Sequence, residues 1–430
     1  MSIPELHYAR SGGVAIAYQV VGAGPPVIYA PHLCSIEALW QAPHTRRFLD
    51  RLAERVQLIV FNPRGTGLSD RPRGISLESR MDDINAVLDA TGLARATLFG
   101  VSESANVCAL FASTFPERCE QLILFTPYET ASGTDEERMR WITDMRDHWG
   151  ERAWMETFAE GISPVYRRDP SLMDWFVWMQ RAAASPGAAT AFARMQMETD
   201  LTDVTPTIKV PTLVVHRSED RAAARAFAER LPDGSSAEIS GHAYDPYEHG
   251  DELTDLIVQV AHREPVPSTY DTVLATFLFT DLTDSTVMAA GMGDEAWRQL
   301  LATHHADVRR ELARFRGTEV NTAGDGFFCR FDGPARAIAC AQAIIDGGEP
   351  RGLVVRAGLH TGECTLVGGE PAGIAVHLAA RVLGEANPGE VLVSRTVKDL
   401  VAGSGNAFED RGEHTLKGIP GAWHLYAVER

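Results

Sequence analysis

The stretch Phe279-Thr280-Asp281-Leu282-Thr283-Asp284-Ser285-Thr286 decides the interpretation of the second half of this chain. It ends the apolar run 273–279, which predicts a buried strand, so Asp281 follows that strand and precedes a hydroxyl-rich turn. Further on, Ala323-Gly324-Asp325-Gly326 predicts a hairpin turn that carries a second aspartate. Two carboxylates at the ends of adjacent strands suit divalent cations such as Mg²⁺. For either motif alone, a turn aspartate that caps a strand end is the simpler interpretation.

Outward from these motifs, the periodicity of the second half predicts an α+β domain of βαββαβ, ferredoxin-like type. The expected elements are a strand at 273–279, a helix at 295–315, a hairpin at 318–331, a helix at 335–345, a strand at 353–360, a helix at 374–383, and short strands near 391–393 and 424–426.

Five motifs occur in one order over residues 272–430, and in that order they resemble the catalytic domain of the class III nucleotidyl cyclases. They are 279–286, 323–326, Arg356-Ala357-Gly358-Leu359-His360-Thr361-Gly362-Glu363, 373–381 and Leu416-Lys417-Gly418. The resemblance implies that ATP is converted to cyclic AMP and pyrophosphate, with two Mg²⁺ or Mn²⁺ ions per site. It implies that Asp281 and Asp325 bind the metals, with the Leu282 carbonyl as a third ligand.

The same resemblance assigns the cations of the site. Arg381 falls where the family has an arginine that stabilises charge developing on the phosphate, and Lys417 where a lysine holds the triphosphate. In this family the two halves of each site come from different chains, so the resemblance implies a homodimer.

Three positions depart from the family pattern. Asn321 stands where adenylyl cyclases carry a base-reading lysine, and Glu370 where an aspartate reads the adenine amino group. His377 replaces an asparagine that contacts the ribose and supports the transition state. Because Arg381 and the metal ligands are kept, we expect a slow and less selective cyclase. The choice between ATP and GTP stays open.

Five short apolar runs in the first half, 27–30, 58–61, 96–99, 122–125 and 212–215, predict buried parallel strands of an α/β fold. This half also carries a different motif. A predicted strand at 96–99 runs into Gly100-Val101-Ser102-Glu103-Ser104 and then a helical pattern, the context of a nucleophile elbow. An acid, Asp220, and a histidine, His242, follow later strands in the order that α/β-hydrolases use, and residues 1–262 resemble that family. The resemblance implies Ser102 as nucleophile, Asp220 and His242 as its partners, and an oxyanion hole from the amides of Leu33 and Glu103.

Activity of this domain is a separate question from its fold. The elbow has Glu103 and Ser104 where glycine or another small residue is usual, and His32 stands where a glycine is common. A second register points to Tyr244-Asp245-Pro246-Tyr247 in place of His242. Either an esterase for a small or lipid-like ester or a regulatory sensor is consistent with these residues, and the Trp- and Met-rich segment 128–205 is expected to form a helical cap.

Composition limits the possible partners. Asp and Glu total 58 against 40 Lys and Arg, a formal net charge of −18, which disfavours binding to nucleic acid. No apolar run is long enough for a transmembrane segment, and the N-terminus lacks the pattern of a signal peptide, so we expect a cytoplasmic protein. The six cysteines are scattered without metal-ligand spacing, and the adjacent His304 and His305 are expected on a helix surface.

The Pro265 and Pro267 segment predicts a connector at 263–271 between residues 1–262 and 272–430. We therefore expect an adenylyl cyclase with an N-terminal α/β-hydrolase domain that acts as an esterase or a sensor. The alternative is an active esterase joined to a degenerate cyclase domain used for dimerisation or nucleotide sensing. Asp281, Asp325 and Arg381 favour the first hypothesis.

Overall fold

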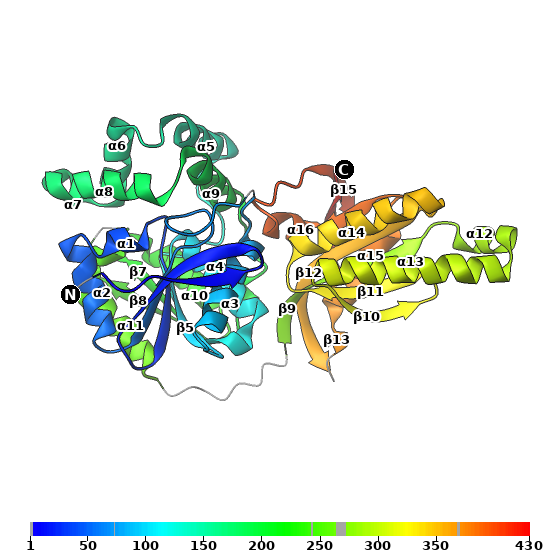
Figure 1. The fold of residues 1–430 in the computed structure, drawn as a ribbon, viewed down its shortest axis with the longest axis horizontal. Helices are drawn as coiled ribbons and strands as arrows, with labels where there is room; N and C mark the ends of the chain where they lie inside the picture. The colour runs from blue at the N-terminus through cyan, green and yellow to red at the C-terminus, as the bar shows by residue number, and fades with distance from the viewer. Residues whose placement is uncertain (1–2, 73, 242–243, 264–271, 368–369) are drawn as a thin grey trace. The chain divides into compact units, whose positions relative to one another are not determined.

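A computed structural model describes residues 3–72, 74–241, 244–263, 272–367 and 370–430 of the 430-residue chain (Figure 1). The chain divides into two compact units, Met1–Tyr270 and Asp271–Arg430. Each unit is built on its own sheet and has its own hydrophobic cores.

The sheet of the first unit has eight strands in the order β1-β2-β4-β3-β5-β6-β7-β8. From β4 to β8 the neighbouring strands are parallel, whereas β1 and β2 form an antiparallel hairpin at one edge. The bounds are β1 His7–Ser11, β2 Val14–Val21, β3 Pro26–Ala30, β4 Gln57–Phe61, β5 Ala96–Val101, β6 Cys119–Phe125, β7 Thr212–Arg217 and β8 Gly234–Ile239.

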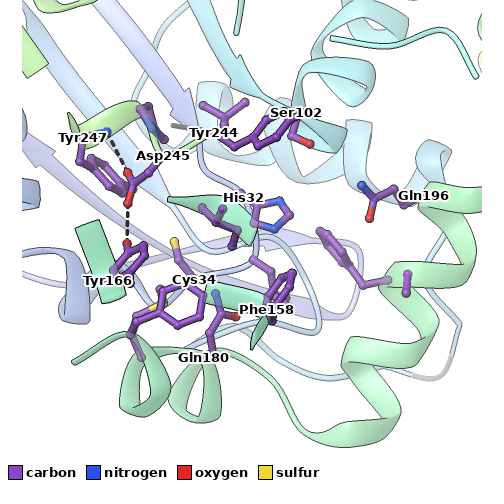
Figure 2. A pocket seen from close by; sticks show the side chains of 18 of the residues that line it. His32, Cys34, Ser102, Phe158, Tyr166, Gln180, Gln196, Tyr244, Asp245 and Tyr247 are labelled. Atoms are coloured by element: carbon purple, nitrogen blue, oxygen red, sulfur yellow. Dashed lines mark hydrogen bonds between the residues drawn. The ribbon is translucent and has the colours of Figure 1, made fainter. Parts of the chain in front are cut away.

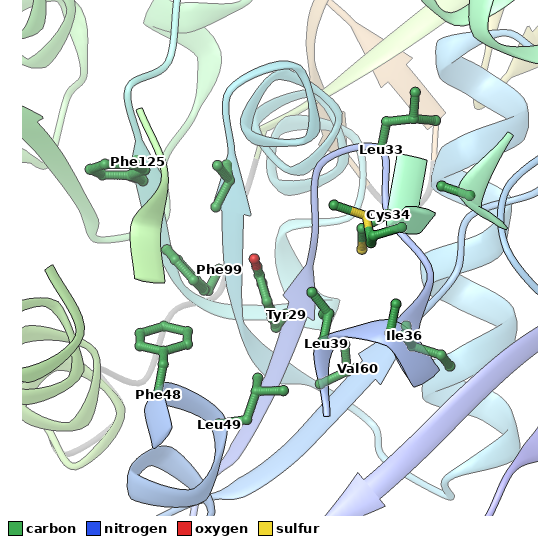
Figure 3. Close-up of a cluster of buried hydrophobic side chains, with 14 of the residues drawn as sticks. Tyr29, Leu33, Cys34, Ile36, Leu39, Phe48, Leu49, Val60, Phe99 and Phe125 are labelled. Atoms are coloured by element: carbon green, nitrogen blue, oxygen red, sulfur yellow. The ribbon is translucent and has the colours of Figure 1, made fainter. Parts of the chain in front are cut away.

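Helices pack on this sheet through a large apolar core (Figure 3). The rings of Tyr29 on β3 and Phe99 on β5 stack with their centroids 4.9 Å apart, and Phe48 packs edge-on against Tyr29. Strands buried on both faces need such continuous apolar runs, which is why the sequence reveals them. The helices are α1 Ile36–Leu39, α2 Pro43–Ala53, α3 Leu77–Ala90, α4 Glu103–Thr114, α10 Arg221–Arg230 and α11 Gly250–Ala261.

Between β6 and β7 the chain forms a separate group of helices. Several of them begin at a side-chain cap followed by proline: Ser163, Asp169 and Ser185 each accept hydrogen bonds from the first turn of the next helix. The helices are α5 Asp135–His148, α6 Arg152–Ile162, α7 Pro164–Arg168, α8 Pro170–Ala183 and α9 Pro186–Glu198. They fall inside the segment 128–205, where the sequence predicts a helical cap.

The second unit also has an eight-stranded sheet. Its order is β10-β11-β9-β12-β14-β16-β15, with β13 paired to β12. The bounds are β9 Thr272–Leu282, β10 Thr318–Ala323, β11 Gly326–Phe331, β12 Val355–Val367, β13 Glu370–Ala372, β14 Val391–Ser394, β15 Phe408–His414 and β16 Trp423–Val428. Strands β9 and β12 pair over a long antiparallel register and form the middle of the sheet.

Five helices join these strands. They are α12 Ser285–Met292, α13 Asp294–Arg314, α14 Pro334–Gly348, α15 Ile374–Glu385 and α16 Arg395–Leu400. The order β9, α12–α13, β10, β11, α14, β12 confirms the predicted βαββαβ arrangement, and the α/β fold predicted for the first unit is confirmed as well.

All six cysteines are free and buried, three in each unit. Burial raises the pKa of Cys108 and Cys340 to about 12, and it raises the pKa of the other four thiols as well. Among the described residues, no helix combines the length and the apolar character needed to cross a bilayer.

Candidate active sites

The two predicted metal-binding aspartates lie at one end of neighbouring strands. Asp281 is the penultimate residue of β9, and Asp325 lies in the turn between β10 and β11. Phe327 on β11 pairs with Thr280 on β9, so the turn that carries Asp325 reaches the end of β9 that carries Asp281. The structure thus brings together two residues that are far apart in the sequence.

The two carboxylates differ in what they contact. Arg356 on β12 lies opposite Asp281 and donates to its Oδ2 from Nη2 at 2.7 Å and from Nε at 3.3 Å. Oδ2 of Asp325 is buried and has no hydrogen-bond partner among the described residues. The His305 ring nitrogen Nε2 donates to the Gly324 carbonyl at 3.1 Å, which holds the turn against α13.

These groups are suitable ligands for a divalent cation whose remaining coordination positions are filled by other ligands. A buried carboxylate oxygen without a partner is costly unless a cation or a donor meets it. No group of three His, Cys, Asp or Glu side chains suited to a metal is present in the described part of the chain, so two carboxylates and the Leu282 carbonyl are the protein ligands to consider. Hard cations accept this kind of oxygen set and complete it with substrate phosphate and water.

The predicted phosphate-binding cations also lie together. Nε of Arg381 on α15 donates to the Lys417 carbonyl at 2.9 Å, and both side chains are exposed. His377 lies four residues before Arg381 on the exposed face of α15, whereas Leu378 and Val382 on the other face are buried. One helix face therefore presents His377 and Arg381 side by side.

The predicted base-reading residues lie on two different strands. Asn321 is exposed on β10, where its Oδ1 accepts a hydrogen bond from the Thr322 amide at 2.8 Å. Glu370 begins β13, and its backbone pairs with Val367, but its side chain lies outside the described residues.

The prediction that both adjacent histidines lie on the surface is wrong for His304. Its side chain is buried at 3% exposure, because the helix turns it towards Phe327 in the core, and burial lowers its pKa to about 4. The sequence did not reveal the contact of Arg356 with Asp281 or that of His305 with the turn that carries Asp325. Only the strand register and the packing of α13 bring them to the aspartates.

In the first unit, Ser102 occupies a strained turn between β5 and α4. Its backbone has φ 54° and ψ −121°, a conformation that a non-glycine residue rarely adopts. The turn is tight: a Cβ at Gly100 would lie 2.7 Å from Cα of Ala105. This geometry is the one expected of a nucleophile elbow, in which the strain exposes the serine hydroxyl.

The proposed partners of Ser102 have a different arrangement from the simple triad. Arg217, at the end of β7, donates to Oδ2 of Asp220 from Nε and lies within 2.7 Å of it. The Arg217 guanidinium also stacks 3.4 Å above the ring of Tyr244. His242 lies outside the described residues.

A cavity of about 270 Å³ lies between the elbow and the cap helices (Figure 2). Ser102 and Leu33 line it, together with aromatic side chains from the cap. Asp245 lies in its wall and accepts hydrogen bonds from the Tyr166 hydroxyl at 2.5 Å and the Tyr247 amide at 2.9 Å. The aromatic side chains from the cap make the walls of this cavity largely apolar.

Family comparisons match the two units separately. Residues 27–161 match the family model described as alpha/beta hydrolase fold, and residues 267–430 match the adenylate and guanylate cyclase catalytic domain. The putative carbamate hydrolase RutD of Azorhizobium caulinodans is 25% identical over 252 residues, 55% of this chain and 91% of that protein. The putative adenylate cyclase 3 of Rhizobium meliloti is 29% identical over 120 residues, 26% of this chain and 20% of that protein.

Other relatives are matched over only part of their length. The chain spans 34% of uncharacterized proteins from Mycobacterium bovis and Mycobacterium tuberculosis, at 29% identity. Among solved structures, the enol-lactonase from Burkholderia xenovorans LB400 superposes with a TM-score of 0.52 at 19% identity, covering 60% of this chain and all of that chain, which shows a shared fold. The chain therefore joins a domain of the α/β-hydrolase fold to a catalytic domain of the adenylate and guanylate cyclase family.

Proposed function

We propose that the second unit converts ATP to cyclic AMP and pyrophosphate, and that the first unit serves it as an esterase or a ligand sensor. The observation that carries the cyclase proposal is the pair Asp281 and Asp325 at one end of adjacent strands. The Asp325 Oδ2 is buried and has no partner within the part of the chain that the structure describes. Together with the family match over 267–430, this pair supports a metal-dependent nucleotide site.

In the proposed reaction, the ribose 3′ hydroxyl loses its proton to solvent and its oxygen forms a bond to the α-phosphorus, while the bond from phosphorus to the pyrophosphate oxygen breaks. Asp281, Asp325 and the Leu282 carbonyl would hold two Mg²⁺ or Mn²⁺ ions. When bound, the ions neutralise the triphosphate and make the 3′ hydroxyl easier to deprotonate. The chain's own donors act on the phosphates: Arg381 and His377 stabilise negative charge at the α-phosphate, and Lys417 holds the pyrophosphate end.

Arg356 already contacts the Asp281 carboxylate that would bind a cation. Both hydrogen bonds of Arg356 end on Oδ2 of Asp281. Asp281 would hold a cation through the same carboxylate that Arg356 contacts, and the Arg356 guanidinium would add positive charge beside the site. Asn321 and Glu370 would read the purine edge, and the active form would be a homodimer in which each site combines Asp281 and Asp325 of one chain with Arg381 and Lys417 of the other.

The direct test is product formation by the purified full chain with ATP or GTP and either Mn²⁺ or Mg²⁺, followed by chromatography of the cyclic nucleotide. We expect cyclic AMP from the parent protein and a loss of at least about 100-fold in D325N, because the amide weakens cation binding. D346N is the matched control, since Asp346 is exposed and paired with Arg430 on the surface. A folded, dimeric parent protein that forms no cyclic nucleotide would overturn the proposal.

For the first unit, the geometry of Ser102 supports a nucleophile. The ion pair of Asp220 with Arg217 favours a binding role instead, because it engages the carboxylate that a triad would use to orient its histidine. A fluorophosphonate probe separates the two. Labelling of Ser102 that S102A abolishes would support an esterase for a small or lipid-like ester, and a folded protein that remains unlabelled would favour the sensor.

A further inference from the structure

Three residues that depart from the usual hydrolase pattern form one hydrogen-bonded network. Glu103 follows Ser102 in the sequence and is 2% exposed. Its Oε2 contacts Nδ1 of His32. Its Oε1 lies 3.0 Å from the Ser104 hydroxyl, whose one proton it shares with the Pro31 carbonyl at 2.9 Å. His32, Glu103 and Ser104 thus act together, although the sequence presents them as three separate irregularities.

A buried arginine donates a hydrogen bond to this network. Arg80 on α3 is 2% exposed and donates to Oγ of Ser104 at 3.0 Å. Burial lowers the pKa of Arg80, and the nearby Glu103 carboxylate opposes that change. The opposite charges of Arg80 and Glu103 therefore compensate each other in the interior.

The network determines how His32 faces the cavity. A carboxylate only accepts hydrogen bonds, so Nδ1 of His32 carries the proton that is donated to Glu103. In a neutral ring, Nε2 is then an acceptor. His32 lines the cavity, and its side chain is 33% exposed, so Nε2 is available to a ligand (Figure 2).

A second acceptor lies in the wall of the same cavity. Gln180 on α8 is 1% exposed, and its Oε1 is buried without a hydrogen-bond partner in the part of the chain that the structure describes. Figure 2 shows Gln180 and His32 among the side chains that line the cavity. A buried acceptor without a donor indicates that a ligand supplies one. Most of the remaining wall is aromatic or aliphatic, including Trp141, Phe158, Trp175 and Phe192.

We propose that this cavity binds a small apolar molecule with a primary carboxamide head, whose two N–H groups donate to His32 Nε2 and Gln180 Oε1. A primary amide NH₂ group is neutral and offers two donors from one atom. A carboxylate offers none and would also be repelled by Glu103. The volume of about 270 Å³ limits the ligand to a short aliphatic or single-ring body. This site requires no turnover at Ser102, and it does not depend on the cyclase reaction.

A matched pair of probes tests the proposal on the full chain without any mutation. Hexanamide and heptan-2-one have the same shape, but a methyl group replaces the NH₂ group in the ketone. Binding is followed by the fluorescence of the cavity tryptophans Trp141 and Trp175. We expect hexanamide to bind at least about tenfold more tightly, since two hydrogen bonds in an apolar site outweigh the greater hydrophobicity of the ketone. Equal or tighter binding of the ketone, or no saturable binding of hexanamide, would show that the proposal is wrong.

Variants then identify the residues. H32F and Q180L replace the acceptor with an apolar group of similar shape, and each should weaken hexanamide binding about tenfold while leaving heptan-2-one within about twofold. The control is H148F, because His148 forms an exposed His–Glu pair with Glu151, 3.1 Å apart, at the end of α5. Unchanged hexanamide affinity in folded H32F and Q180L would contradict the assignment. If either variant fails to fold, the comparison of the two probes on the parent protein decides the question. Because no ATP is present, failure here is distinct from failure of the cyclase proposal.

Discussion

Ser102 carries a backbone strain that can be measured by substitution. With φ 54° and ψ −121°, glycine should occupy this position more easily than serine or alanine. We expect S102G to be more stable than S102A by about 1 kcal/mol, measured by urea unfolding of the first unit. Since both variants lack the hydroxyl, their difference reports the backbone alone. S102A at least as stable as S102G would show that the turn holds no such strain.

His360 makes the stability of the second unit depend on pH. Its ring is buried, its Nδ1 lies 2.8 Å from Oγ of Ser394, and burial lowers its pKa to about 3. The unfolded chain binds a proton below pH 6.5, but the folded chain does not until about pH 3. His360 therefore contributes full stability above pH 6.5 and loses about 1.4 kcal/mol per pH unit as the pH falls below it.

Urea unfolding between pH 7.5 and 4.5 checks this expectation. His304, whose pKa falls to about 4, adds a loss of the same sign. H360Q should lower stability at pH 7.5 because it disturbs the core, but it should flatten the decline with pH. An H360Q protein with the same slope as the parent would assign the acid sensitivity to other groups.

Among single residues, the sequence predicted those that belong to recognisable motifs. It missed those whose contacts depend on how the strands pair. Asp281, Asp325, Arg381 and Ser102 were found because each follows a strand or lies in a recognisable pattern. Arg356 was not found as the partner of Asp281, because that contact depends on the pairing of β9 with β12.

At the scale of elements, α15 packs on β12 at a glycine. A Cβ at Gly358 would lie 2.1 Å from the Leu383 amide nitrogen and 2.4 Å from its Cα, so any larger side chain must push the helix away. Because α15 carries His377 and Arg381, we expect G358A to destabilise the second unit by about 2 kcal/mol and to reduce cyclic AMP formation at least about tenfold.

The same helix offers the control. Gly384 lies in α15, and a Cβ placed there would point into open space among the residues that the structure describes. G384A should be neutral or stabilise the helix by up to about 1 kcal/mol, with activity unchanged. Thermal unfolding and cyclic AMP output are measured for both variants. If G358A and G384A behave alike, the close contact of Gly358 with α15 does not position His377 and Arg381.

Strands and helices with strong periodicity were predictable, and weakly apolar elements were not. The apolar runs of β3 to β7 predicted the parallel sheet, and the long amphipathic α13 was found within a residue of its ends. In contrast, β8 is largely exposed and polar, so neither an apolar run nor alternation marks it as a strand. The β1–β2 hairpin was missed as well, because its signal is short and it pairs at the edge.

For the whole molecule, a mixing experiment tests the proposed homodimer. If each site takes its aspartates from one chain and Arg381 from the other, D325N and R381A are each inactive alone. A mixture that exchanges subunits should recover about a quarter of the parent activity, because half of the dimers are mixed and each has one intact site. Output that stays at the sum of the two variants would indicate that each chain builds its own site.

The rate at which buried thiols are modified reports how often each unit opens. Their raised pKa values and burial keep them unreactive in the folded state. A thiol reagent should therefore modify Cys108 and Cys119 only when the first unit opens, and Cys329, Cys340 and Cys364 only when the second does; Cys34 is set aside because it lines the cavity. Mass spectrometry of iodoacetamide-treated protein should therefore give two separate sets of rates. Addition of nucleotide and Mn²⁺ should slow the second set, because a bound ligand suppresses unfolding, while an equal slowing of the first set would reveal that the two units are energetically coupled.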